Sequence, residues 1–308
     1  MEKIILTIRN IKFRLYYLTL FKIKTGMRRF FSKSMKYNRP ASFPYITGDG
    51  FRSIAQHVFD EIQTIQFGDV AEGDIVFVRA DFLHDFFKKV HPCIENKYIL
   101  ISHNSDQNIN SQFVEYIDDK IIHWFAQNVL VAHKKITPLP IGLQLRIYNA
   151  KNIVIELLEK NKIENEKDIK IFYAFSEETN GKRSTALRHL KNNVLTTGSS
   201  TALERSEYYK AINKNAFNAS PEGGGIDCHR TWESMYLGSI PVLERNVSTS
   251  YWQDIGLPVF LIDSWGEIDT IQAKNLEEFY IQSKSKFNSP ALYIDYWITE
   301  IIKHKHAR

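Results

Sequence analysis

Short apolar runs alternate with amphipathic stretches from about residue 41 to the end of the chain. The apolar runs favour buried strands, and stretches with apolar residues three or four apart favour helices. We expect strands at residues 74–78, 98–101, 121–131 (with a turn), 136–142, 169–175, 217–220, 240–243 and 259–262. We expect helices at residues 51–62, 82–90, 152–167, 184–193, 206–210 and 291–303, and a further one from Asp227. This alternation predicts an α/β fold with doubly wound, Rossmann-like sheets.

The length of 308 residues is typical of two such domains. We expect a basic arm at residues 1–40, a first Rossmann-like domain at 41–160 and a second at 165–285. Residues 288–308 then contain a helix that is able to cross back to the first domain. The prolines of the 136–142 run favour an edge strand or the end of a strand.

The stretch from Phe217 to Glu244 carries the clearest chemistry. It holds a glycine turn, Pro221 to Gly225, between a predicted strand and the helix that starts at Asp227. Three successive glycines have no Cβ, so this turn is able to take backbone conformations that other residues avoid. The helix N-terminus that follows presents free N–H groups and a partial positive charge, which suits a phosphate.

Charged side chains lie where this helix and an earlier one begin. Arg230 and Glu233 are three apart and share a helix face. The arginine is able to fork onto a diphosphate, and the glutamate to accept hydrogen bonds from a ribose diol. Lys182 and Arg183 lie where the 169–175 strand meets its helix, and positive charge there also suits a diphosphate. The alternatives are a solvated ion pair for the first two and surface charge for the second two.

The helix and the strand after it resemble the signature of a known family. They read Asp227-x-x-Arg230-x-Trp232-Glu233 and then Gly238-Ser239-Ile240-Pro241-Val242. This pattern resembles the exostosin-like (family 47) glycosyltransferases. The resemblance implies a GT-B fold, in which two Rossmann-like domains face each other across a cleft and the C-terminal one holds the sugar nucleotide. It also implies that Arg230 lies near the donor diphosphate and Glu233 near the ribose.

Eleven residues around these motifs form the expected donor site. They are Lys182, Arg183, Ser220, Glu222, Gly223, Gly224, Gly225, Asp227, His229, Arg230 and Glu233.

A second polar cluster, Ser-His-Asn-Ser-Asp at residues 102–106, follows the strand at 98–101. The carboxyl ends of strands are where α/β domains place their chemistry. We therefore expect His103 or Asp106 to be the general base that an inverting transferase needs for its acceptor hydroxyl. Asp81, which follows the preceding strand and is placed to cap the next helix, is a third candidate. The alternative is a loop built on Asx turns, with a histidine that is fully hydrogen-bonded.

Several motifs are absent from the sequence. The chain has no Asp-x-Asp pair of the kind that holds a metal in GT-A transferases, and no cluster with zinc spacing. We therefore expect no metal and no cofactor apart from the nucleotide sugar. Two glutamates eight residues apart, as in many retaining GT-B enzymes, are also missing, which favours inversion. The two cysteines, Cys93 and Cys228, make no disulfide framework.

The positive charge of the chain is concentrated at its start. Residues 1–40 carry eleven basic and one acidic residue, for +10, so the remaining 29 basic and 34 acidic residues sum to −5. No apolar run approaches the ~20 residues that a membrane span needs. Residues 1–36 favour a helix on an anionic membrane surface, and the alternatives are a disordered arm or a helix packed on the body. Nothing else in the chain supports binding to nucleic acid.

These features together predict a glycosyltransferase. It moves a sugar from a nucleoside diphosphate sugar, UDP in the first instance, to a glycan or lipid-linked acceptor. We expect it in the cytoplasm at the inner membrane leaflet, in surface polysaccharide or lipopolysaccharide synthesis. Two alternatives stay open: transfer from a GDP-sugar, as in fucosyl transfer, and a non-catalytic module that binds a sugar nucleotide or glycan.

Overall fold

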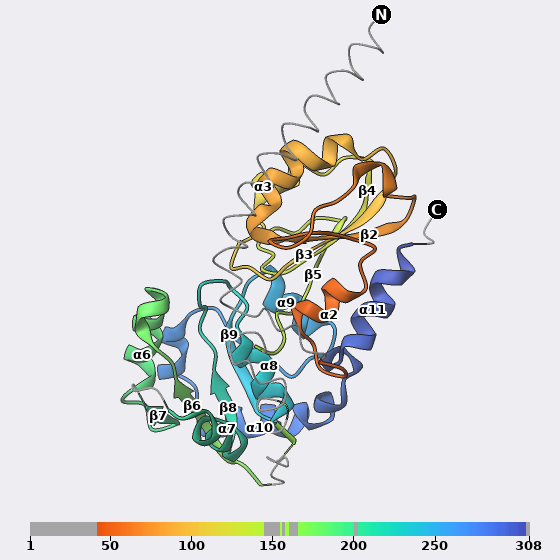
Figure 1. The fold of residues 1–308 in the computed structure, drawn as a ribbon. Helices are drawn as coiled ribbons and strands as arrows, with labels where there is room; N and C mark the ends of the chain where they lie inside the picture. Colours follow the sequence, from red (N-terminus) through yellow and green to blue (C-terminus); the bar gives the residue numbers. More distant parts are fainter. Residues whose placement is uncertain (1–41, 145–154, 156–157, 160–165, 200–202, 306–308) are drawn as a thin grey trace, which may run out of the picture.

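The fold consists of two parallel five-stranded sheets, one in each half of the chain (Figure 1). The computed structural model describes residues 42–144, 155, 158–159, 166–199 and 203–305. The expected basic arm and most of the helix expected at 152–167 lie outside these residues. The two-domain, Rossmann-like α/β architecture predicted from the sequence is confirmed.

The first sheet keeps its strands in the order of the chain, β1-β2-β3-β4-β5, and all of them are parallel. Its strands are β1 (His57–Phe59), β2 (Asp74–Arg79), β3 (Tyr98–His103), β4 (Ile121–Ala126) and β5 (Ile136–Pro138). Its helices and turns are α2 (Gly48–Ser53), η1 (Phe67–Asp69), η2 (Ala80–Phe82), α3 (Leu83–Asp85), η3 (Phe86–Val90), η4 (His91–Cys93) and α4 (Ser111–Val114). The proline-containing strand β5 lies at the edge, as expected.

Alternate side chains of the first sheet enter two different cores. Val76 and Val78 point to a core that is closed by Phe86 and Phe113, from the sheet's own connections η3 and α4. Ile75 and Phe77 point to the opposite core. A strand that is buried on both faces needs a cover on both, and the second cover comes from elsewhere in the chain.

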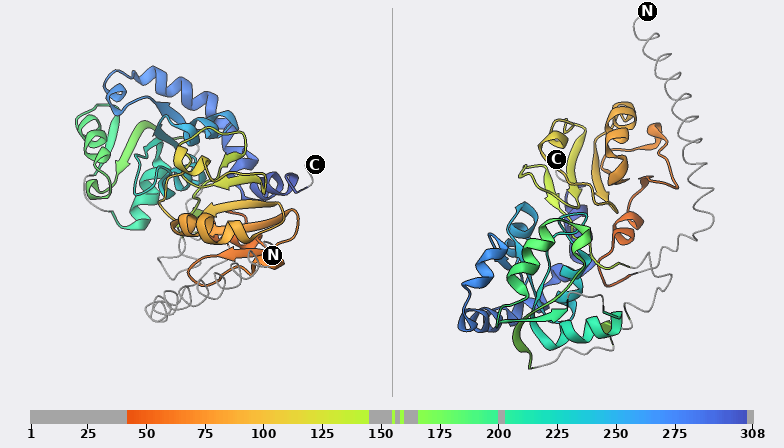
Figure 2. Two further views of the ribbon diagram at one scale, coloured as in Figure 1. Left: turned by 90° about the horizontal axis from the view of Figure 1, so that it is seen from above. Right: turned by 90° about the vertical axis from the view of Figure 1, so that its left-hand side faces the viewer.

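This second cover consists of α2 and three helices from the second half: α8 (His229–Tyr236), α9 (Val247–Asp254) and α11 (Ile294–Lys303). Each of the three helices from the second half contributes a fully buried tryptophan: Trp232, Trp252 and Trp297. The left view of Figure 2 shows α11, in dark blue, beside the strands of the first sheet. None of the described helices is both long enough and apolar enough to cross a membrane.

The second sheet has the order β10-β9-β8-β6-β7, again with all strands parallel. Its strands are β6 (Asp168–Ala174), β7 (Thr196–Ser199), β8 (Asn215–Ala219), β9 (Ile240–Glu244) and β10 (Phe260–Ile262). Its other elements are η5 (Glu177–Thr179), α6 (Lys182–Leu190), α7 (Arg205–Lys214), η6 (Trp265–Asp269), α10 (Ala273–Ser283), η7 (Lys284–Asn288) and η8 (Pro290–Leu292). The chain runs outward from β6 to β7 and then returns to β8 on the other side. The winding therefore reverses between β6 and β8, which is where such sheets form a ligand crevice.

Two local predictions in the first half are wrong. The helix expected at 51–62 is the shorter α2, which starts earlier because the Thr47 hydroxyl accepts from the Gly50 N–H at 3.0 Å. The chain then enters strand β1, because Val58 and Phe59 pair with β2. Asp81 does not cap a helix, since its carboxylate is turned toward neighbouring side chains.

Candidate functional site

The carboxyl end of β6 borders a pocket of about 500 Å³. Its walls come from the loop after β6, from η5, from α7 and from the first turn of α8. The lining residues are Ala174, Phe175, Ser176, Glu177, Glu178, Leu203, Tyr208 and Arg230. This is the reversal point of the second sheet, so strand order and pocket agree on the position of a site.

Arg230, the second residue of α8, is the most informative side chain in the pocket. Its guanidinium carbon lies 5.6 Å from the centre of the Phe175 ring. Its Nε and Nη1 atoms are buried and have no hydrogen-bond acceptor among the described residues. Burying such a donor without an acceptor costs about 1–3 kcal/mol, and more when it is charged. An anionic or polar ligand in the pocket would supply these acceptors.

Arg183 on α6 brings a second guanidinium to the same ring, at 5.8 Å from its centre. Its Nε donates to the carbonyl of Glu222 at 2.8 Å, and its Nη1 to the carbonyl of Ser176 at 3.1 Å. Burial, and after it the neighbouring charge of Arg230, lower the pKa of Arg183. Two cations that repel each other at a helix N-terminus suit a ligand with two negative groups, such as a diphosphate.

Lys182 lies at the outer rim of this cationic pair. It is 59% exposed and forms an ion pair of 2.8 Å with Glu222. The hydrogen bond to Glu222 raises the pKa of Lys182. Glu222 thus holds Lys182 with its carboxylate and Arg183 with its carbonyl. Of the three cations expected near the diphosphate, Arg230 and Arg183 therefore meet at Phe175, which lines the pocket, while Lys182 is paired with Glu222 beside them.

Glu233 is buried and bound within the second half. Its Oε1 accepts from the Tyr209 hydroxyl at 2.8 Å and lies 3.5 Å from Arg205 Nη1. The solvated ion pair between Arg230 and Glu233, considered above as an alternative, is not formed. Glu233 is instead part of the support on which α8 rests.

Asp227 and His229 lie at the contact between the two halves. The Asp227 carboxylate accepts from the Ile141 N–H at 2.7 Å and from the Trp232 indole at 3.0 and 3.1 Å. Burial raises the pKa of the Asp227 carboxyl to about 7. His229 Nδ1 donates to the carbonyl of Gly142 at 2.6 Å, and burial lowers its pKa. Both were expected to bind the donor, but their contacts join the halves because the start of α8 faces residues 141–142.

The glycine turn is compact and touches both halves. The Gly223 N–H donates to the carbonyl of Gly225 at 2.9 Å, and a Cβ on Gly223 would lie 3.1 Å from Arg183. A Cβ on Gly224 would overlap the carboxylate of Asp106 in the first half. Ser220, just before the turn, is buried and shares a hydrogen bond of 2.8 Å with the Thr231 hydroxyl. The turn therefore separates the cationic pair from the 102–106 loop.

The three candidates for a catalytic base have different surroundings. His103 is 1% exposed, accepts from the Asn104 N–H at 2.7 Å and donates to the Pro140 carbonyl at 2.9 Å. Both ring nitrogens are engaged, which favours the alternative of a fully hydrogen-bonded histidine over a base at His103. Asp81 is bound to Arg79 and to the Ser105 hydroxyl. Asp106 is exposed and lies against Gly224.

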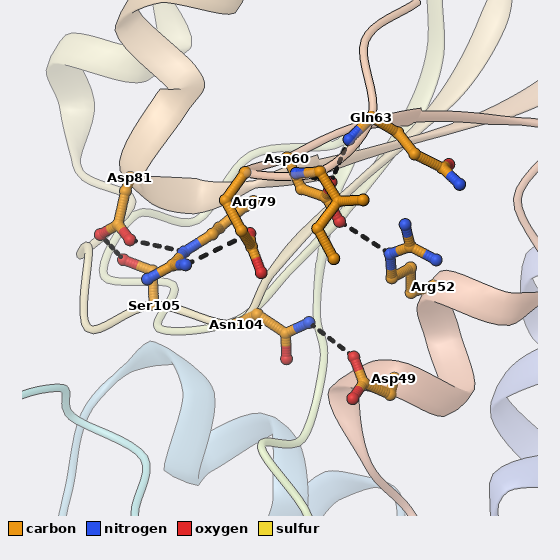
Figure 3. Close-up of polar contacts among 10 residues, drawn as sticks. Asp49, Arg52, Asp60, Gln63, Arg79, Asp81, Asn104 and Ser105 are labelled. Carbon is orange, nitrogen blue, oxygen red and sulfur yellow. Dashed lines mark hydrogen bonds and ion pairs between the residues drawn. The ribbon is translucent and has the colours of Figure 1, made fainter. Parts of the chain in front are cut away.

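Figure 3 shows a polar network on the first half that the sequence reading missed. It joins α2 to the carboxyl ends of β1, β2 and β3. Its pairs are Arg52–Asp60 (2.8 Å), Arg79–Glu61 (3.2 Å), Arg79–Asp81 (2.7 Å), Asp81–Ser105 (2.5 Å) and Asn104–Asp49 (3.4 Å). Asp60 follows β1 and Arg79 ends β2, so the rule that pointed to residues 102–106 applied to them as well. Among the described residues, no three His, Cys, Asp or Glu side chains lie close enough together to hold a metal ion.

Comparison with known proteins gives structural likeness without sequence likeness. No protein-family model and no curated protein matches the chain. A UDP-forming α,α-trehalose-phosphate synthase from Burkholderia vietnamiensis is similar at 8% identity and a TM-score of 0.43, over 76% of this chain and 73% of that one. An apo structure of OtsA reaches 9% identity and a TM-score of 0.45, over 78% and 74%. TarM reaches 14% and 0.33, over 74% and 54%. At these levels the reaction has to be argued from the site itself.

Proposed function

We propose that this protein is a glycosyltransferase that uses a nucleoside diphosphate sugar, UDP-linked in the first instance, as its donor. One observation carries the proposal. The buried Nε and Nη1 atoms of Arg230 have no acceptor among the described residues, and they lie beside Arg183 at the reversal point of the second sheet. A diphosphate supplies the acceptors and the two negative groups that this position calls for.

In this proposal the second half stabilises the leaving group. Arg230, Arg183 and the N-terminus of α8 bind the diphosphate, and their charge stabilises the negative charge that develops as the bond from the anomeric carbon to the diphosphate oxygen breaks. Glu233, one turn after Arg230, is the proposed partner of the ribose diol through its Oε2 atom, because Tyr209 and Arg205 contact Oε1. The chain's own cations perform this step in the proposal, without a metal.

The first half activates the acceptor. Asp106 is the proposed base: it takes the proton from an acceptor hydroxyl whose oxygen attacks the anomeric carbon, with inversion. Its exposure and its position against the glycine turn support this role. The acceptor is a glycan or a lipid-linked sugar of surface polysaccharide or lipopolysaccharide synthesis. The charge of +10 on residues 1–40 supports attachment to an anionic membrane surface, on the cytoplasmic side.

Calorimetric titration tests the donor site. UDP, GDP, CMP and their common sugar conjugates are titrated, with and without Mg²⁺, into the wild type and Arg230→Gln. We expect micromolar binding of one nucleotide that does not depend on Mg²⁺. The variant loses charge-assisted hydrogen bonds of about 1.5–3 kcal/mol each, so its affinity falls roughly 10- to 100-fold or more. Arg245→Gln is the control, since this arginine of the same half is exposed and pairs with Asp263.

The other outcomes of this titration distinguish the alternative functions. Binding of GDP alone selects the GDP-sugar alternative. Nucleotide binding that depends on Arg230, with no consumption of any donor in the presence of glycan acceptors, selects the non-catalytic module. If no nucleotide binds, or if Arg230→Gln binds as well as Arg245→Gln, the proposed donor site is wrong.

A further inference from the structure

Asn128 joins the donor side of the molecule to the acceptor side through one amide group. It follows β4, is 1% exposed and has a φ of 58°, in the left-handed region that asparagine tolerates better than most residues. Its Oδ1 accepts from the N–H of Asp227 at 3.0 Å, and its Nδ2 donates to the carbonyl of Ser105 at 3.2 Å. Only this orientation of the amide satisfies both partners, because one is a donor and the other an acceptor.

The two partners belong to the two loops of the proposed reaction. The Asp227 N–H lies between the glycine turn and α8, whose first turn carries Arg230. Ser105 precedes Asp106, and its hydroxyl bonds both to Asp81 and to the Gln107 N–H. The backbone on either side of Asp106 is therefore tied down, on one side through Asn128.

The glycine turn approaches Asn128 so closely that no side chain fits between them. A Cβ on Gly225 would lie 2.5 Å from Nδ2 and 2.9 Å from Oδ1 of Asn128. A displacement of the turn of a few tenths of an ångström is therefore transmitted directly to this amide. A buried, close-packed contact transmits such shifts better than a solvated one.

We propose that Asn128 is a positioning residue that couples occupation of the diphosphate site to the placement of Asp106. An anion between Arg183 and Arg230 orders the glycine turn, the turn fixes the Asn128 amide, and the amide fixes the Ser105 carbonyl next to Asp106. This inference rests on the proposed function and adds to it an order of events: the donor prepares the loop that activates the acceptor.

A neighbouring contact provides a matched control. Ser248 on α9 donates its hydroxyl to the carbonyl of Val129 at 2.8 Å, and it too is buried between the halves. It bonds to the residue after Asn128 but to neither of the two loops. Ser248→Ala therefore removes a buried hydrogen bond of the same contact region and leaves the proposed coupling intact.

The experiment is hydrogen–deuterium exchange of the segment 103–110, with inorganic pyrophosphate as the probe. Pyrophosphate binding is first measured by calorimetry for the wild type, Asn128→Gly and Ser248→Ala. Glycine adopts the same φ without strain, so Asn128→Gly removes the amide and little else. We expect dissociation constants within about threefold of one another. Pyrophosphate slows exchange of the segment in the wild type and in Ser248→Ala, and has no effect on it in Asn128→Gly.

The proposal is overturned if pyrophosphate binds the wild type without protecting the segment. It is also overturned if Asn128→Gly keeps the protection, or if Ser248→Ala loses it to the same extent. If Asn128→Gly does not fold, Asn128→Asp replaces it. That variant keeps the acceptor for the Asp227 N–H, loses the donor to Ser105, and is expected to lose the protection as well. If pyrophosphate, UDP and GDP all fail to bind the wild type, the proposed function has failed, and the inference fails with it.

Discussion

The two sheets of this protein have the same number of strands and the same parallel pairing, yet they differ in winding and in cover. The strands of the first sheet follow the order of the chain, and helices of the second half cover one of its faces. The second reverses between β6 and β8 and is covered by its own helices, α6 and α10 on one face and α7 on the other. A pocket lies at this reversal of the second sheet, so the proposed donor site lies there and the first sheet contributes loops.

Because helices of the second half cover the first sheet, the stability of each half depends on the other. Trp232, Trp252 and Trp297 pack edge to face, with ring centres 5.5 and 5.7 Å apart. They come from three helices of the second half and close a core of the first sheet. The close approach of the glycine turn to Asp106 and Asn128 follows from this shared core, because the core holds α8 against the first sheet.

The largest expected effect on stability comes from removing a tryptophan of α11 that covers the first sheet. Trp297→Ala should lower the free energy of unfolding by about 3–5 kcal/mol, because it leaves a large cavity beside the first sheet. Urea unfolding measures the loss, and hydrogen exchange shows which strands open. We expect faster exchange in β3 and β4 than in β6 and β8, although α11 belongs to the second half of the chain.

The matched variant is Trp265→Ala, which is equally buried but packs in the core of the second sheet. It should cost a similar free energy and open β6 and β8 first. If exchange rises in the same sheet for both variants, the helices that cover the two sheets do not stabilise them separately.

A smaller effect on stability is expected at the contact between Gly225 and Asn128. Gly225→Ala places a Cβ against the buried Asn128 amide and should cost about 1–3 kcal/mol. Gly181→Ala is the control, because its φ is −58° and no atom lies within 4 Å of the added Cβ. It should change the free energy of unfolding by no more than about 0.5 kcal/mol. Thermal melting of both variants measures the loss of stability. An equal loss in Gly225→Ala and Gly181→Ala would mean that the glycine turn moves away from Asn128 at little cost.

The third effect depends on pH and concerns the contact between the halves. Burial raises the pKa of folded Asp227 to about 7, above the ~3.9 of an unfolded chain. Between these values the folded protein holds a proton that the unfolded chain has lost. The contribution of Asp227 to stability therefore falls as pH rises through this window, by at most about 1.4 kcal/mol per pH unit.

Asp227→Asn cannot titrate and keeps an oxygen for the Ile141 N–H. Urea midpoints measured from pH 4.5 to 8 should fall less steeply in the variant than in the wild type. The exposed Asp263→Asn shows the effect of removing a carboxylate outside this contact. Parallel curves for wild type and Asp227→Asn would show that the aspartate stays ionised throughout, stabilised by its hydrogen bonds.

Most of the fold could be predicted because long apolar runs become buried strands in either sheet. The exceptions are β1, where three residues lie inside a stretch whose apolar spacing also fits a helix, and β7, whose residues form no apolar run. The strand order could not be predicted, nor could the source of the second cover, since both depend on contacts between residues far apart in the chain. The local pattern of apolar and polar residues carries no information on such contacts.

The site could be predicted in part for the same reason. The glycine turn, Arg230 and Arg183 stand out locally, because a turn, a helix start and a cation occur together. The burial of His103 could not be predicted, because β3 extends two residues further than the apolar run. Asn128 left no signal: it is one polar residue after a strand, and its partner Asp227 is 99 positions away.

The smallest expected effect is on anion binding in the second half, where the adjacent cations Lys182 and Arg183 differ in burial. Arg183 is buried over Phe175, whereas Lys182 is exposed and already paired with Glu222. An exposed ion pair contributes about 0–1 kcal/mol, so Lys182→Ala should weaken pyrophosphate binding by no more than about threefold. Arg183→Gln should weaken it about tenfold or more, because it removes a charge from a poorly solvated position.

Calorimetry at 50 and 200 mM salt separates the two contributions. Salt screens exposed charges more than buried ones, so the difference between wild type and Lys182→Ala should shrink at high salt, while that for Arg183→Gln should persist. The reverse result would mean that the anion binds at the rim of the pocket. In that case the unpartnered nitrogens of Arg230 would need another explanation, and the reversal point of the second sheet would no longer mark the donor site.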